Sequence, residues 1–281
     1  RTVSRGLGDV YKRQQLYDSA ITQMNRQQSN VAEMQAKLAS GKSLVKPSDD
    51  AEKATLIQRL NSAMQRQDVF EVSLDHAESR LRSEESALMS GQDMLQRIRE
   101  LAIQGSNGTL SISDRTIIAK EVSSLRDALF SLANTEDASG NFIFSGTIVK
   151  EPAFSKNGDG VISYMGDQNQ TSVDISEYRQ VSINRPGHAV FSSVVRTSGD
   201  GDPVVIDFFK VISDFADALE SGTDKGLTQG LTEISALTDD LALSLADLGS
   251  RMNTVDSQRD ILIDTKLRYQ ELLSNAEDLD Y

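Results

Sequence analysis

Apolar residues recur at every seventh position over two long stretches of the chain. The first stretch carries five leucines in this register with an isoleucine beside them: Leu60, Leu74, Leu81, Leu88, Leu95 and Ile98. A repeat of seven lines apolar side chains along one seam of an α-helix and is typical of coiled coils. No proline interrupts residues 49–104. The pattern therefore predicts one helix over this range, roughly 80 Å long at about 1.5 Å per residue.

The second repeat lies near the C-terminal end and contains six apolar or aromatic positions: Ile234, Leu241, Leu248, Val255, Leu262 and Tyr269. It predicts a second long helix, preceded by a shorter one that starts at about Val204 and ends before Gly222. A long intervening segment joins the two repeats. We therefore expect the two long helices to run antiparallel as a rod.

A narrower apolar stripe runs through the N-terminal region, where the spacing of three and four indicates a helix: Tyr17, Ile21, Met24, Val31 and Leu38. A stripe this narrow needs one or two partner helices to bury it. We expect this assembly helix to fray in a free monomer and to become ordered when neighbours cover it. Gly41 is predicted to end the helix, and Ser48 to cap the next one with Asp49 and Asp50 in its first turn.

The character of the chain changes between residues 140 and 203, which hold 8 of the 18 glycines and 3 of the 4 prolines. Short alternating runs such as "VISYM", "TSVDI" and "RQVSI" separate these turn residues and predict strands. Before them, a helix starting at Ser111 or Ser113 is expected to fold back along the first long helix. The predicted fold is mainly α: a long antiparallel coiled-coil-like rod with a small β-rich insertion at its tip.

These elements suggest five segments along the chain. They are a segment 1–14 that does not match the rest of the chain, an N-terminal assembly helix 15–44, the first half of the rod 45–139, the β-rich insertion 140–203 and the second half of the rod 204–281.

Charge and composition exclude several classes of protein. The net charge is −13 and no cluster of Lys and Arg stands out, which argues against a nucleic-acid partner. The absence of cysteine removes disulfides, thiolate metal sites and cysteine nucleophiles. No apolar run approaches the ~18 residues of a membrane span, and no cleavable secretory signal is visible. Any export must therefore use another route.

The residues that could support catalysis or metal binding are isolated. His76 lies off the apolar seam, and His188 comes after a predicted Pro186-Gly187 turn, so both are expected to be solvated. In "SKNGDGVISYMGD" a serine and a glycine replace the first and last acidic ligands of a calcium loop, which favours a simple Asp-Gly hairpin turn. The adjacent Glu84 and Glu85 are expected on the solvated face of the rod. We predict no enzyme activity and no cofactor.

Two stretches, "LASGKSLVKPSDDAEKATLIQRL" and "MLQRIRELAIQGSNGTLSISDR", resemble the flagellin superfamily. The matching positions are Ser40, Gly41, Pro47, Asp49, Asp50, Arg97, Arg99, Glu100, Asn107 and Gly108. Further along, "NTEDASGNFIFSGT", "YMGDQNQTSVDI" and "SINRPGHAVF" are similar to the hook–filament junction proteins of that superfamily rather than to filament flagellins. The resemblance covers the chain from about Leu16 onward.

The resemblance implies a structural subunit of the bacterial flagellum that self-assembles into a helical ring for motility. It also implies type III export by the flagellar channel to the extracellular flagellum, with a dedicated export chaperone. The implied neighbours are copies of the same chain, the preceding hook-associated junction protein and flagellin.

Two departures from the family pattern and two other functions stay open. Residues 1–14 read as adaptor-derived sequence, and the chain stops before the C-terminal assembly helix of the family. A filament flagellin with a small outer domain is the nearest alternative, and a coiled-coil signalling protein of the chemoreceptor type is a more distant one.

Overall fold

The computed structural model describes residues 3–44, 46, 48, 50–197 and 203–278, without the side chains of residues 3–11 and 197. The chain divides into two compact units. One contains residues 1–68 and 262–281, and the other contains residues 69–261. The two longest helices after the N-terminal one, α2 (Ala51–Gly105) and α6 (Asp224–Glu277), each contribute to both units.

In the first unit, helix α1 (Val3–Ser40) ends where the sequence predicts. Gly41 comes next with φ = +67°, a left-handed conformation that glycine adopts at little cost and that commonly ends a helix. Beyond it, the Ser43 amide donates to the Glu277 carbonyl at 2.6 Å, and Lys42 Nζ lies 2.7 Å from the Glu277 carboxylate. The base of α1 is thus fastened to the end of α6.

The N-cap of α2 is Asp50 rather than Ser48. The Asp50 carboxylate accepts from the Lys53 amide at 3.0 Å, and its carbonyl accepts from the Ala54 amide at 2.9 Å. A carboxylate in this position satisfies a free amide and interacts favourably with the helix dipole, which explains why the helix begins later than predicted. The predicted first-turn residue Asp49 lies outside the described residues.

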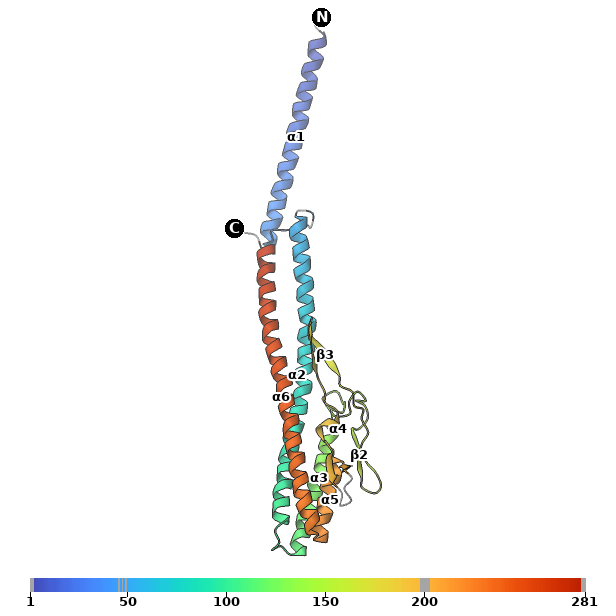
Figure 1. The fold of residues 1–281 in the computed structure, drawn as a ribbon. Coiled ribbons are helices and arrows are strands. Elements are labelled where there is room, and N and C mark those ends of the chain that lie inside the picture. Colours follow the sequence, from blue (N-terminus) through green and yellow to red (C-terminus); the bar gives the residue numbers. More distant parts are fainter. Residues whose placement is uncertain (1–2, 45, 47, 49, 198–202, 279–281) are drawn as a thin grey trace. The chain divides into compact units, whose positions relative to one another are not determined.

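In the second unit, α2 and α6 run antiparallel (Figure 1). Gly91 of α2 lies against Leu241 of α6, whereas Asp75, earlier in α2, pairs with Arg259, later in α6. The seam residues of this unit are each at most 1% exposed: Leu74, Leu81, Leu88, Leu95, Ile98, Ile234, Leu241, Leu248 and Val255. In the first unit, Leu60 and Leu262 are also buried, and Tyr269 is half-buried.

Helix α3 (Ile112–Ala133) folds back along α2. Its residue Ile118 lies beside Gly105 of α2, and its residue Leu132 lies beside Gly91. Of the two predicted starting serines, Ser111 is the N-cap: its hydroxyl accepts from the Asp114 amide at 3.2 Å, and Asp114 reciprocates. This capping box satisfies two amides that would otherwise lack partners at the helix start.

Helix α5 (Phe208–Ser221) packs against α3 and starts later than the predicted Val204. Residues 203–206 form a strand instead, since Val204, Val205 and Ile206 are β-branched and favour extended backbone. The helix ends at Gly222, whose φ is +67°. α6 begins two residues later.

The described strands form three two-stranded antiparallel sheets. The pairs are β1 (Phe154–Lys156) with β2 (Ile162–Tyr164), β3 (Ser172–Ser176) with β4 (Arg179–Ser182), and β5 (Val194–Thr197) with β6 (Pro203–Ile206). A short helix, α4 (Gly187–Val190), lies between β4 and β5. Tightly packed phenylalanine rings, including Phe154, Phe191 and Phe209, form a core between this region and α5.

The turn between β1 and β2 is the expected hairpin. The Asn157 side-chain oxygen accepts from the amides of Asp159 at 3.0 Å and Val161 at 2.9 Å. Gly160 adopts φ = +82°, which a residue with a Cβ rarely does. The asparagine oxygen therefore organises the turn together with backbone hydrogen bonds from Asn157 to Val161 and from Gly160 to Asn157, each 3.0 Å long.

The β-rich insertion lies along the side of the helices in the second unit, not at their tip as predicted (Figure 1). Ser182 at the end of β4 accepts a hydrogen bond from Arg251 in the middle of α6, and Arg196 of β5 pairs with Glu233. The reason is that α3 returns along α2 for 22 residues before the insertion starts. The turns between α2 and α3 and between α5 and α6 occupy the end instead.

Candidate assembly surfaces

The apolar stripe of α1 is open to solvent in the first unit. Each predicted assembly residue is more than half exposed: Tyr17 71%, Ile21 53%, Met24 67%, Val31 55% and Leu38 58%. Leu16 and Met34 extend the same stripe. A run of large apolar side chains this long is unusual on a soluble monomer and marks a surface for another protein.

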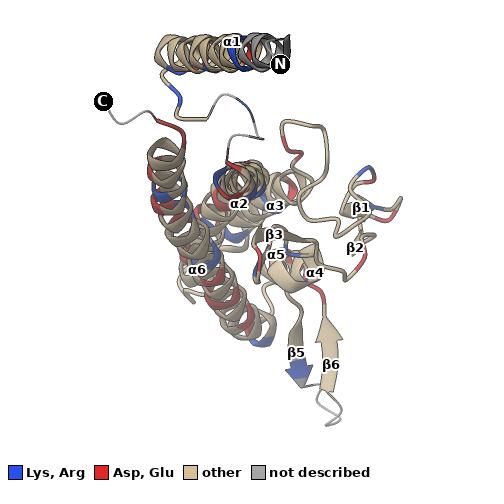
Figure 2. Ribbon diagram, turned by 90° about the horizontal axis from the view of Figure 1, so that it is seen from above, with Lys and Arg blue, Asp and Glu red and all other residues tan. Residues whose placement is uncertain are grey.

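Few charges interrupt this surface. Between residues 16 and 40 the helix carries only Asp18, Arg26, Glu33 and Lys37, and Figure 2 shows the described part of α1 as mostly tan with a few blue and red stretches. Glu33 and Lys37 form an ion pair at 2.7 Å, which contributes about 0.3–0.5 kcal/mol in an exposed helix. Local interactions thus stabilise α1 weakly, whereas each Leu or Met buried by a partner would contribute roughly 1.5–3 kcal/mol.

In the second unit, a buried ion pair joins the two long helices to the insertion. Arg251 Nη2 of α6 lies 2.8 Å from Glu84 Oε1 of α2, and Arg251 Nη1 donates to the Ser182 carbonyl at 3.3 Å. Glu84 is completely buried, and this burial raises its pKa against the opposing effect of Arg251.

The prediction that Glu84 lies on the solvated face is therefore wrong. Glu84 lies three residues after Leu81 and four before Leu88, on the face of α2 that packs against α6, whereas the neighbouring Glu85 is half-exposed. The heptad spacing contains this signal, because Glu84 is in register with the buried Ala77 and Ile98 at the second apolar position of the repeat.

Two more arginines fasten the insertion. Arg80 is 7% exposed, donates to the carbonyls of Phe142 at 3.2 Å and Ile143 at 3.3 Å, and pairs with Asp137. Partial burial alone would raise the pKa of Asp137, but hydrogen bonds to its carboxylate hold that pKa below its ordinary value.

Arg196 of β5 makes a bidentate contact with Glu233 of α6, at 2.8 and 2.7 Å, and a third bond to Asp214 of α5 at 2.8 Å. These acids raise the pKa of Arg196, with Glu233 the largest cause. A planar guanidinium is suited to such paired contacts, so these arginines fix the orientation of the insertion.

The family-motif residues lie at helix ends and on the surface. Arg97 bonds to Glu121 of α3 at 2.9 Å and to Glu100 at 3.1 Å, while Arg99 is exposed. Asn107 shapes the turn after α2, where its side-chain oxygen accepts from the Thr109 amide at 3.1 Å. Gly108 is exposed in this turn, and Ser40, Gly41 and Asp50 lie at the ends of α1 and α2. Pro47, like Asp49, lies outside the described residues.

The two histidines do not meet. His76 is exposed on α2, and His188, predicted in a loop, lies in the short helix α4 with its ring 5.6 Å from that of Tyr164. Over the described residues, no group of three His, Asp or Glu side chains is placed to hold a metal ion. Among those same residues, no helix has the length and apolar character of a membrane span.

The comparisons with known proteins agree with this architecture. Residues 12–148 match the bacterial flagellin N-terminal helical region. This match covers slightly less than half of the chain. Over 291 aligned residues it is 24% identical to flagellar hook-associated protein 3 of Escherichia coli, an alignment that covers 96% of this chain and 89% of the relative.

Solved structures give the same fold. The flagellar hook-associated protein 3 of Legionella pneumophila superposes with a TM-score of 0.69 at 19% identity, covering 78% of this chain and 98% of that one. The flagellar junction protein FlgL of the same organism superposes with a TM-score of 0.67 at 18% identity, covering 81% of this chain and 100% of that one.

Similarity to filament flagellins is confined to part of the chain. Flagellin B of Vibrio cholerae is 34% identical over 111 residues, which is 40% of this chain and 30% of the flagellin. The hook-associated proteins instead match along nearly their whole length. The comparisons thus favour a hook–filament junction protein over a filament flagellin.

Proposed function

We propose that this chain is a structural subunit of the bacterial flagellum that serves as an adaptor at the hook–filament junction by assembling with copies of itself into a helical ring. The observation that carries the proposal is the similarity to hook-associated protein 3 along nearly the full length of both chains. The exposed apolar stripe of α1 supplies a surface that assembly would bury.

The mechanism is geometric rather than catalytic. Subunits that meet through different surfaces on each copy form either closed rings or helical arrays, depending on the rotation between neighbours. The second unit offers a rigid surface for such contacts, because Arg251, Arg80 and Arg196 hold its β-rich insertion against the helices. A firm subunit allows two polymers of different stiffness to be joined at a defined angle.

The ordering of α1 supplies a second step. A lone helix with a narrow apolar stripe is marginal in water, so residues 16–38 would fold fully only against neighbouring subunits. Coupling order to assembly would keep the subunit soluble before and during export. It would also make the contacts between α1 and the neighbouring subunits cooperative.

The partners follow from this position in the flagellum. One end of the ring would contact the preceding hook-associated junction protein, and the other would contact flagellin. Before assembly, a flagellar export chaperone would hold the subunit for type III export to the extracellular flagellum.

Immunogold labelling of flagella sheared from the source bacterium tests the proposal. Antibodies against the β-rich insertion are expected to label one band where the hook meets the filament. Labelling along the whole filament would instead identify a filament flagellin, and absence from flagella would revive the signalling-protein alternative. A strain in which the gene is deleted supplies the negative control for the antibody.

A further inference from the structure

The hairpin formed by β3 and β4 carries an aromatic side chain with no cover of its own. Tyr178 lies in the two-residue loop between Ser176 and Arg179 and is 94% exposed. Tyrosine is a common anchor at protein interfaces because it offers a large contact area for the loss of few rotatable bonds. An isolated tyrosine at a loop tip is therefore a candidate contact residue for a complementary surface on another subunit.

The hairpin presents this tip in a fixed conformation. Gln180 Nε2 donates to Asp174 Oδ1 across the two strands at 2.7 Å, and the Ser172 and Ser182 hydroxyls lie 3.2 Å apart. At its base, the Ser182 carbonyl accepts from Arg251. A pre-organised tip loses little conformational entropy when it binds.

The charged residues on either side of Tyr178 also have no ion-pair partner among the described residues. Glu177 and Arg179 are both exposed, and neither forms an ion pair with another described residue. The tip therefore offers a negative group, an aromatic ring and a positive group in sequence.

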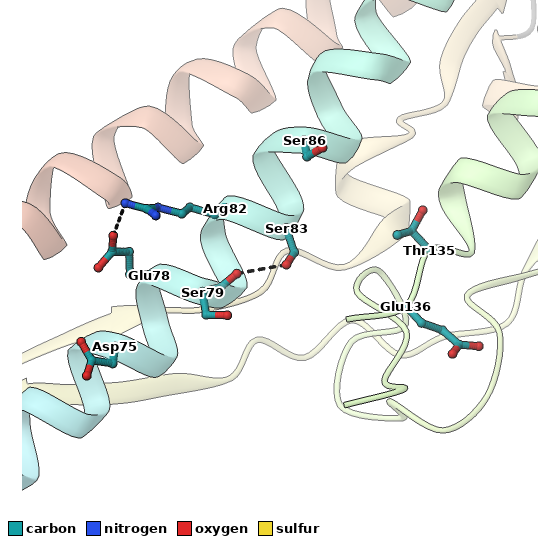
Figure 3. Close-up of a pocket in the computed structure, with 8 residues that line it drawn as sticks. All are labelled: Asp75, Glu78, Ser79, Arg82, Ser83, Ser86, Thr135 and Glu136. Carbon is teal, nitrogen blue, oxygen red and sulfur yellow. Dashed lines mark hydrogen bonds and ion pairs between the residues drawn. The ribbon is translucent and has the colours of Figure 1, made fainter. Parts of the chain in front are cut away.

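A polar groove of about 670 Å³ lies in the same unit between α2 and the segment after α3 (Figure 3). Its α2 wall carries Arg82, whose side chain is 68% exposed and contacts only Glu78 among the described acids. Its opposite wall carries Glu136, which is exposed and has no cationic partner among the described residues.

Hydroxyl groups line the floor between these walls. Ser83 and Ser86 project from α2 toward Thr135 in Figure 3. Such groups can accept a hydrogen bond from a phenol or donate one to it. The groove thus offers a cation for Glu177, hydroxyls for Tyr178 and a carboxylate for Arg179, with Asp75 and Glu78 as further acids on its α2 wall.

The base of the hairpin and the groove lie at one level of the unit. Ser182, at this base, accepts from Arg251, which pairs with Glu84, and the α2 wall of the groove runs from Asp75 to Ser86. A copy placed beside the first would therefore need only a small axial shift, on the order of the length of the hairpin, to bring its tip to the groove. Within one chain Tyr178 remains exposed, so the groove is open to a neighbour.

We propose that the β3–β4 tip of one subunit docks into the α2 groove of the adjacent subunit, with Tyr178 between a Glu177–Arg82 pair and an Arg179–Glu136 pair. This contact is heterologous, because tip and groove are different surfaces, and it can be repeated around a ring. The proposal rests on the self-assembly of the chain and adds the specific lateral contact.

Cross-linking between full-length variants tests it directly, since the chain has no cysteine of its own. Ser176→Cys, which leaves Glu177, Tyr178 and Arg179 in place, and Ser86→Cys are placed on separate molecules, co-expressed, and treated in isolated flagella with a short bismaleimide. The matched control replaces Ser86→Cys with Ser221→Cys, an exposed serine at the end of α5, where Leu219 lies against Gly105, far along α2 from Ser86. Docking is expected to give at least about fivefold more heterodimer than the control pair, through high local concentration.

A charge exchange provides the second measurement. Arg179→Glu on the Ser176→Cys chain should lower the heterodimer yield to the control level, and Glu136→Arg on the Ser86→Cys chain should restore it. Equal yields from the groove pair and the control pair would overturn the docking while junction labelling left the proposed function standing. If the parent chain is absent from the junction, the proposed function fails, and the yield ratio in concentrated solution decides the contact separately.

Discussion

Arg251 of α6 and Glu84 of α2 form an ion pair, 2.8 Å apart, in which Glu84 is fully buried and the Arg251 side chain is 13% exposed. Arg251 also donates to the Ser182 carbonyl and lies 3.2 Å from Asp247. The pair matters most for Glu84, which without Arg251 would be a buried charge that has lost its partner.

We expect Arg251→Met to destabilise the second unit by about 3 kcal/mol or more, because Glu84 would remain buried without its cation. The double variant Glu84→Leu/Arg251→Met should recover most of that loss. Urea unfolding followed by circular dichroism measures both. If the single and double variants lose stability equally, the pair is not the source of the effect.

Two glycines of α6 offer a matched test of close packing. A Cβ on Gly230 would overlap the Phe215 ring of α5, whereas a Cβ on Gly249 meets nothing within 4 Å. Gly230→Ala should therefore destabilise by about 1–3 kcal/mol through overpacking. Gly249→Ala should stabilise by about 0.5–1 kcal/mol, because alanine is the better helix former.

Thermal or urea unfolding of the two alanine variants in parallel decides this prediction. Opposite signs are expected from the same chemical change on the same helix. Stabilisation in both variants would mean that α5 is not held against α6 in solution as it is in the structure.

The Asp167 carboxylate should make folding of the insertion pH-dependent. It accepts from the Thr147 hydroxyl, from the Thr147 amide at 2.8 Å and from Asn169, and these bonds lower its pKa to about 2. Because the folded pKa lies below the unfolded one, the stabilisation is complete above about pH 4 and is lost as the pH falls toward 2.

Comparison with Asp167→Asn isolates this effect from the other acidic groups. The stability difference between parent and variant should shrink as the pH decreases from about 4 to 2, since the parent carboxylate becomes protonated in that window. Unfolding curves at closely spaced pH values measure it. A difference that stays constant across this window would contradict the assignment.

The exposed stripe of α1 predicts different protection in the free and assembled states. In a monomer, amide hydrogens of residues 16–38 should exchange rapidly, whereas those of α2 around Leu81 and Leu88 should be protected, because these leucines are buried. In assembled rings, residues 16–38 should become protected. Hydrogen exchange with mass spectrometry measures both, and full protection of 16–38 in the monomer would rule out folding coupled to assembly.

The sequence predicts the long helices well because their signals are local and repeated. The seven-residue spacing of leucines identifies α2, and the capping residues before it place its start to within two residues. Gly41, Ser111 and Gly222 mark helix ends through their own backbone or capping chemistry. These features do not depend on distant parts of the chain.

The features that the sequence does not reveal depend on contacts between distant segments. The pairing of Glu84 with Arg251 joins residues 167 apart in the chain, and Arg196 binds Glu233, 37 residues away. The shift of the insertion from tip to flank has the same origin, because the length over which α3 retraces α2 is set by packing. Arg97 is recognisable from its motif, but its bond to Glu121 is not.

The insertion leaves the helices after α3 and returns at α5, and these two helices pack against each other, with Arg126 donating to the Ser213 hydroxyl at 3.0 Å. Its two ends are therefore held close together by the helical part. Lengthening such a loop costs little, about 0.6 kcal/mol for each doubling. The β-rich insertion can thus lengthen or shorten during evolution at a small cost in folding free energy, while the leucine seam of α2 and α6 keeps its register.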